Sequence, residues 1–142
     1  MKEKMDFFCE VWDELGVPVR SIPRSLYPCF LNSNPRTQYT VPSGGYFVLA
    51  NLSALDLPSP EEYDYPPHVL SRARDFRLCW WLIREIGVAA IPPTEFYKDG
   101  SEGVAWAEDY LRFAVCKDRE VLEEAKKRLR GLKAHLKRAG EI

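Results

Sequence analysis

The sequence has little net charge and no long hydrophobic run. Its 142 residues include 20 Lys plus Arg against 21 Asp plus Glu, which leaves a net charge of -1. A surplus of basic residues is what attracts proteins to nucleic acid or anionic membranes, so this balance favours neither partner. No apolar run reaches the length of a membrane span. Any partner must therefore be inferred from particular residues.

Closely spaced metal ligands and thiol pairs are also absent from the sequence. The cysteines are Cys9, Cys29, Cys79 and Cys116, and the histidines are His68 and His135. No CxxC pair occurs, whereas structural zinc sites use closely spaced ligand pairs, so no metal site is predicted and the thiols are expected to be reduced. Cys116 beside Lys117 could be a reactive thiol, but a structural strand cysteine is the favoured interpretation.

The N-terminal residues carry charges where a secretory signal needs an apolar stretch, so a cytoplasmic protein is predicted. A mitochondrial location stays open for a longer parent protein, since a transit peptide would precede this sequence. The spacing of apolar residues predicts a helix over residues 2–15 that lacks a capping residue. That start suggests a chain cut from a longer one.

The remaining patterns predict a single α+β domain over residues 1–142, in which about three helices pack against a small sheet. Nine of the eleven prolines lie between Pro18 and Pro67, which excludes long helices there. The predicted elements are a strand at 46–52, a helix at 69–86, strands at 88–91 and 110–116, and a final helix from Asp118, as N-cap, to Leu136. Residues 20–41 and 54–67 are predicted surface loops, and residues 98–103 a mobile turn.

The strand at 110–116 carries the one residue to which a chemical role can be given. Alternation places Leu111 and Phe113 on one face and Arg112 on the other, among small side chains. A guanidinium there needs a partner, and its planar fork fits a carboxylate bidentately. The competing interpretation is an internal salt bridge to an acidic side chain such as Asp109 or Glu95, or simple exposure. No carboxylate pair, Ser/His/Asp set or Cys/His set stands out, so no catalytic residue is predicted.

Three segments together resemble the C-terminal small domain of class I pyridoxal-phosphate aminotransferases, which have fold type I. They are residues 44–47 (GGYF), residues 75–97 (DFRLCWWLIREIGVAAIPPTEFY) and residues 110–118 (YLRFAVCKD). The most similar branch is kynurenine aminotransferase, also known as cysteine-S-conjugate β-lyase. The resemblance covers residues 42–136 well and residues 1–19 as the start of the same domain, and residues 20–41 look like an inserted loop.

The resemblance implies that Arg112 binds the α-carboxylate of an amino-acid or 2-oxo-acid substrate. It also implies a cofactor, pyridoxal phosphate, held in the intact enzyme by a Schiff-base lysine and other residues of a large domain, with a homodimeric parent. This chain shows no matching lysine motif, so no covalent cofactor is expected on it. The first hypothesis is thus an inactive C-terminal fragment of such an enzyme. The alternative is a free-standing α+β module that binds an amino acid or a protein.

Overall fold

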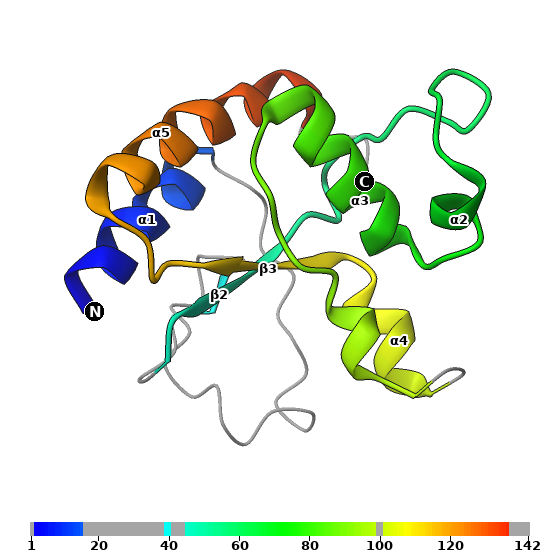
Figure 1. Cartoon of the computed structure of the whole chain (residues 1–142), viewed down its shortest axis with the longest axis horizontal. Coiled ribbons are helices and arrows are strands. Elements are labelled where there is room, and N and C mark those ends of the chain that lie inside the picture. Colours follow the sequence, from blue (N-terminus) through cyan, green and yellow to red (C-terminus); the bar gives the residue numbers. More distant parts are fainter. Residues whose placement is uncertain (1, 16–38, 41–44, 99–100, 137–142) are drawn as a thin grey trace.

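A computed structural model of the chain describes residues 2–15, 39–40, 45–98 and 101–136 (Figure 1). The described α-helices are α1 (Lys2–Leu15), α2 (Pro67–Leu70), α3 (Arg74–Trp81), α4 (Glu102–Ala107) and α5 (Arg119–Leu129). The strands are β1 (Tyr39–Thr40), β2 (Phe47–Asn51) and β3 (Tyr110–Ala114). Shorter turns of helix are the π-helix η2 (Leu82–Ile86) and the 3₁₀ helices η3 (Pro93–Phe96) and η4 (Arg130–His135). The predicted α+β class, with a small sheet and several helices, is confirmed.

The sheet is antiparallel, with the strand order β1-β2-β3. In the β2–β3 ladder, Val48 lies opposite Phe113 and Leu49 lies opposite Arg112. Neighbouring residues of a strand point to opposite faces, so the buried Val48 and Phe113 share one face while Leu49 and Arg112 share the other. The first face is core, and the second is half-buried.

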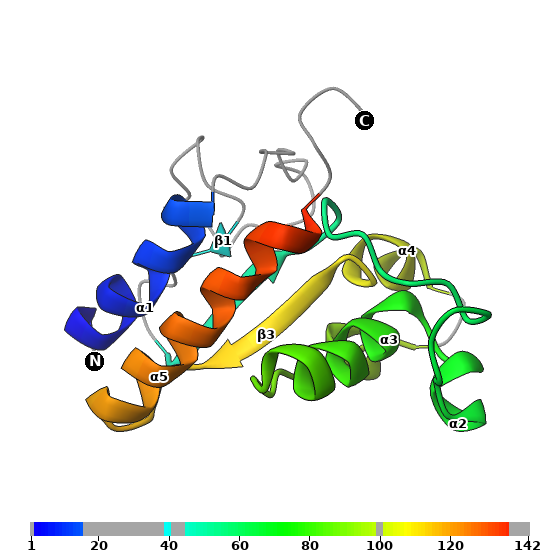
Figure 2. The same cartoon turned by 90° about the horizontal axis from the view of Figure 1, so that it is seen from above.

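The core face of the sheet packs against α1 and α5, which lie side by side in both views (Figures 1 and 2). The aromatic rings of Phe8 and Trp12 on α1 have their centroids 5.9 and 5.2 Å from that of Phe113. The apolar face predicted for residues 2–15 is buried along its whole length, from Met5 to Leu15. Local periodicity therefore identified this helix correctly.

The single helix predicted over residues 69–86 is wrong, because the chain breaks between α2 and α3. Ala73 has extended backbone angles, and the next two residues have tertiary partners that fix a new helix start. The buried side of α3 and η2 is formed by Leu78, Trp81 and Leu82, whereas Ile83 of the predicted stripe is 49% exposed.

Two predictions around residues 88–103 also need correction. The segment 88–91 is not a regular strand, since it joins the sheet through one isolated bridge between Ile91 and Arg112. A mobile turn is predicted at 98–103, but helix α4 already begins at Glu102. Residues 99–100 lie outside the described part of the chain. With six residues, α4 is too short to show a clear apolar period.

Of the two predicted surface loops, 20–41 and 54–67, only the second lies largely within the described residues. Residues 20–41 fall almost wholly outside the described residues, except that residues 39–40 form β1. Residues 54–67 do form a loop with exposed carboxylates, but the segment is partly core, because Ala54, Leu55 and Tyr65 are buried. At the last helix, Asp118 occupies the N-cap position without a side-chain capping bond, and α5 tightens after Leu129 into η4.

A half-buried ion pair joins α5 to α1. The Lys126 side chain, 4% exposed, donates through Nζ to Oε2 of Glu10 at 2.6 Å, and its ammonium lies 3.9 Å from the Phe7 ring centroid. Glu10 itself is 61% exposed, so water weakens the pair from one side. Removing the glutamate would leave a buried ammonium without its carboxylate.

We therefore expect Glu10→Gln to lower the free energy of unfolding by about 1–2 kcal/mol, less than for a fully buried pair because Glu10 is exposed. Lys126→Met, which replaces the charge by an apolar chain of similar volume, should cost less than Glu10→Gln. Urea unfolding of both variants measures the difference. Glu123→Gln, which breaks the exposed Arg119–Glu123 pair, is the control and should leave the midpoint unchanged. A Lys126→Met cost above that of Glu10→Gln would contradict the argument.

Candidate functional site

Arg112 stands at the middle of β3, on the half-buried face of the sheet. Its backbone N–H donates to the carbonyl of Ile91 at 3.0 Å, and the N–H of Ile91 donates back at 2.9 Å. The strand is thus held on one side by β2 and on the other by the segment that precedes η3. These two neighbours fix the backbone of Arg112 and the face of the sheet from which its side chain projects.

Two aromatic rings contact the Arg112 guanidinium. Its Cζ lies 3.5 Å from the ring centroid of Phe47 and 5.0 Å from that of Phe96. Phe47 lies opposite Ala114, and Arg112 is therefore its diagonal neighbour on the same face. Such contacts attract a cation through the negative face of the ring without neutralising its charge. Phe96 is 62% exposed, so this side of the guanidinium borders solvent.

The acidic partners that the sequence offered to Arg112 are bound elsewhere. Asp109 accepts a hydrogen bond from Arg74 at 2.9 Å, and Arg74 also donates to the carbonyl of Leu55. Glu95 is ion-paired with Arg72. Within the described residues Arg112 has no ion pair, so the interpretation of an internal salt bridge to Asp109 or Glu95 is wrong. Simple exposure is wrong as well, because the side chain is half-buried.

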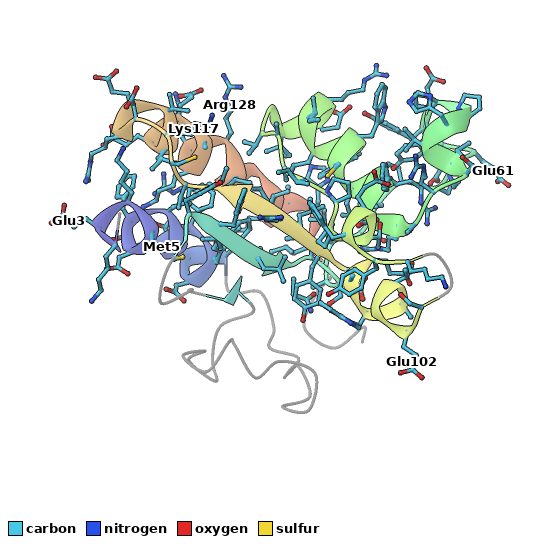
Figure 3. The ribbon with its side chains drawn as sticks, turned by 60° about the horizontal axis from the view of Figure 1, so that its bottom comes forward. Glu3, Met5, Glu61, Glu102, Lys117 and Arg128 are labelled. Atoms are coloured by element: carbon cyan, nitrogen blue, oxygen red, sulfur yellow. The ribbon has the colours of Figure 1, made fainter. Side chains whose placement is uncertain are left out.

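A cavity of about 680 Å³ opens beside β3, between residues 87–91 and one side of α5. Its apolar lining includes Phe8, Phe113 and Leu122, and Arg112 lies at its border. Lys117 and Arg128 lie along the α5 side, where Figure 3 shows both side chains. Sequence reasoning missed this cavity, because it depends on how three separate segments diverge.

Gly87 forms one corner of the cavity and ends η2 in the left-handed region, with φ of 75°. The guanidinium of Arg128 donates to its carbonyl at 2.9 Å. A Cβ at this position would lie 2.7 Å from Nη1 of Arg128. The backbone angle thus favours glycine here, and a larger residue would also displace the end of the Arg128 side chain.

Thiol and metal chemistry have little support in the described part of the chain. Burial raises the pKa of Cys9 and of Cys79 to about 12, so both stay protonated at neutral pH. Cys116 is exposed and lies beyond the end of β3, so the interpretation as a structural strand cysteine is wrong. No group of three His, Cys, Asp or Glu side chains that could hold a metal occurs among the described residues. The helices described are also too short or too polar to cross a membrane.

The chain is similar to known proteins both in sequence and in structure. The chain is 44% identical over 133 residues, or 94% of its length, to the Saccharomyces cerevisiae protein named "Probable kynurenine--oxoglutarate transaminase BNA3". The crystal structure of Bna3p superposes with a TM-score of 0.73 at 43% identity. The chain matches the C-terminal part of kynurenine aminotransferase. It covers 24% of the BNA3 sequence and 26% of the Bna3p chain in the crystal, so it spans about a quarter of the length of these relatives.

More distant similarities agree. A kynurenine–oxoglutarate transaminase of Dictyostelium discoideum is 32% identical over 94 residues, which is 66% of this chain and 21% of that protein. N-Succinyldiaminopimelate aminotransferase of Mycobacterium tuberculosis has a TM-score of 0.56 at 21% identity, and the match covers 92% of this chain and 24% of that one, which shows the shared fold of the aminotransferases. No family model matches the chain. The resemblance inferred from the three sequence segments is confirmed.

Aminotransferases of this fold use pyridoxal phosphate, and among the described residues no buried lysine lines the cavity. Lys126 is the one buried lysine among them, and it is ion-paired with Glu10 rather than facing the cavity. Lys117 borders the cavity but is exposed. No step of the chemistry is therefore assigned to the cofactor on this chain.

The burial of the thiols predicts their order of reaction. With iodoacetamide at pH 8, Cys116 should be alkylated in the folded chain, because its side chain is exposed. Cys9 and Cys79 should react after unfolding in urea, because burial both shields them and keeps them protonated. Peptide mass spectrometry before and after unfolding identifies each site. Alkylation of Cys79 at the rate of Cys116 in the folded chain would contradict the buried environment.

Proposed function

We propose that this chain is the C-terminal part of a pyridoxal-phosphate-dependent aminotransferase of the kynurenine type, and that Arg112 binds the α-carboxylate of its substrate. The observation that supports the role is a half-buried guanidinium that has aromatic neighbours but no carboxylate among the described residues. The similarity to BNA3 supports the enzyme class. The substrate would be an amino acid or the corresponding 2-oxo acid.

The aromatic neighbours suit this role. A ring that covers the flat face of a guanidinium leaves the N–H groups at its edge free to donate in the guanidinium plane. A carboxylate can then approach edge-on and accept two parallel hydrogen bonds. Phe47 thus orients the cation, and its neutral ring does not compete with the substrate for the charge. An internal aspartate in the same place would have to be displaced first.

The rest of the enzyme lies outside the matched quarter of the relatives. We propose that residues 1–142 form one domain that acts with a large domain and a second subunit, as in a homodimeric parent enzyme. The large domain would supply the lysine, the phosphate-binding groups and the chemistry of the cofactor. The chain alone would then neither hold pyridoxal phosphate covalently nor transaminate, and its own contribution is to bind and orient the substrate carboxylate.

A graft tests the role of Arg112. The matching 133 residues of BNA3 are replaced by this chain, and Arg112→Lys is made in the graft. Loss of a charge-assisted bidentate contact costs about 1.5–3 kcal/mol, so the KM for the amino acid should rise roughly tenfold to a hundredfold. Steady-state kinetics measure KM and kcat, with the visible absorbance of the bound cofactor as a check on folding.

Arg119→Lys is the matched control for the graft. Arg119 also lies over a ring, 4.2 Å from the Phe7 centroid, but it stands at the start of α5 and is ion-paired with Glu123. Its replacement should leave KM unchanged. An unchanged KM in Arg112→Lys would remove the proposed role.

A titration tests the inactivity of the isolated chain. Pyridoxal phosphate added to the purified chain, followed by borohydride reduction, should leave no lysine modified in stoichiometric yield. The reason is that the described lysines are exposed, half-buried or, for Lys126, ion-paired. Intact and peptide mass spectrometry provide the measurement. A stoichiometric adduct on one lysine would instead favour an independent module with cofactor chemistry of its own.

A further inference from the structure

Asp75 is the buried titratable group that the proposed function does not use. Its side chain, in the first turn of α3, is fully buried at 0% exposure. One carboxylate oxygen accepts from the backbone N–H of Thr94 at 2.9 Å, and the other accepts from the Thr94 hydroxyl at 2.9 Å. Burial raises the pKa of this carboxyl, and the hydrogen bonds from Thr94 and from the backbone N–H of Phe76 oppose that rise.

The hydrogen bonds from Thr94 to Asp75 also position Thr94. A buried carboxylate is costly unless its oxygens are hydrogen-bonded, and an apolar pair of the same shape is often no less stable. No cation is ion-paired with Asp75 among the residues described. What the two hydrogen bonds do provide is direction, because together they fix both the backbone and the side chain of Thr94.

Thr94 lies between the two segments that contact Arg112. Three residues before it, Ile91 exchanges backbone hydrogen bonds with Arg112. Two residues after it, within the same η3 turn, Phe96 places its ring 5.0 Å from the guanidinium. The orientation of η3 therefore decides which side chain of this turn faces Arg112.

The neighbour of Phe96 in η3 is Glu95, an acidic residue that could neutralise Arg112. It is ion-paired with Arg72, but both side chains of that pair are about half exposed, at 47% and 52%. Such exposed pairs contribute about 0–1 kcal/mol, too little to keep a carboxylate from a second cation. A further constraint on the turn is needed.

We propose that Asp75 and Thr94 form a clamp that keeps Arg112 unpaired. By fixing η3, the clamp holds the Phe96 ring, rather than the Glu95 carboxylate, beside the guanidinium. Asp75 and Thr94 are thus positioning residues, which act on Arg112 through the turn and touch no substrate. The consequence for substrate binding rests on the proposed function, whereas the effect on Arg112 does not.

The effect on Arg112 can be measured on the full chain by NMR, without substrate. The Arg112 Nε–H signal is assigned by its loss in Arg112→Lys. In the wild type it should show nuclear Overhauser contacts to the rings of Phe47 and Phe96. Asp75→Asn, which keeps the shape, and Thr94→Val, which removes the hydroxyl donor, should both lose the Phe96 contact. The Nε–H signal should also move as Glu95 accepts from it.

Two further variants separate positioning from general loss of structure. Thr94→Ser keeps the hydroxyl and should retain the wild-type contacts. Adding Glu95→Gln to Thr94→Val should remove the carboxylate-dependent part of the shift. Thermal unfolding checks that each variant is folded; if Asp75→Asn does not fold, the Thr94→Val and Thr94→Ser comparison decides. A retained Phe96 contact in folded Thr94→Val would overturn the proposal.

The graft supplies the functional readout. There, Thr94→Val should raise the KM for the amino acid roughly tenfold with little change in kcat, and Glu95→Gln added to it should restore KM. A KM rise that Glu95→Gln does not reverse would overturn the competition between Glu95 and substrate. If Arg112→Lys left KM unchanged while the NMR contacts changed as expected, the proposed function would fail and the clamp would stand.

Discussion

The β2–β3 ladder is the constraint on which the rest of this structure depends. Its alternation sends Val48 and Phe113 into a core shared with α1 and α5, and sends Phe47 and Arg112 to the opposite face. A shift of one residue in register would bury the guanidinium among the rings of α1 and expose Phe113. The hydrophobic core therefore fixes the position of the cation. The stability of the fold and the geometry of the candidate site are consequences of the same pairing.

The basic side chains around the sheet differ in the groups that bind them. Arg74 is bound by Asp109 and backbone carbonyls, Arg72 by Glu95, and Lys126 by Glu10. Arg112 is held by neutral rings instead. Asp109 and Glu95, the acids that the sequence offered to Arg112, are each bound by another arginine, and Arg112 has no ion pair within the described residues. This distribution is what the proposed role of Arg112 in binding a carboxylate requires.

Sequence patterns predicted the parts of the fold that local periodicity decides. The helix at α1, the strands β2 and β3 and the face on which Arg112 stands all follow from apolar spacing over a few residues. The break before α3 and the short helix α4 could not be predicted, because they depend on tertiary partners or are too short to show a period. The Phe47 and Phe96 rings were missed for a related reason. Both lie in segments that resemble the family, but a diagonal pair across two strands and a turn held by Asp75 are visible only in three dimensions.

The contact of Arg112 with rings rather than with an internal carboxylate affects the free energy of binding an added carboxylate. An arginine paired with an internal carboxylate is stabilised in the free protein, and a substrate must displace that carboxylate before it can bind. A ring stabilises the cation less, by about 0.5–2 kcal/mol, and stays in place when a carboxylate arrives at the edge. A carboxylate ligand therefore binds more tightly to an arginine that only rings stabilise, because no internal carboxylate has to be displaced. If Arg112 binds and releases a substrate carboxylate as proposed, neighbours such as Phe47 and Phe96 suit it better than an aspartate would, and the proposed role of the buried Asp75 is to keep this arrangement.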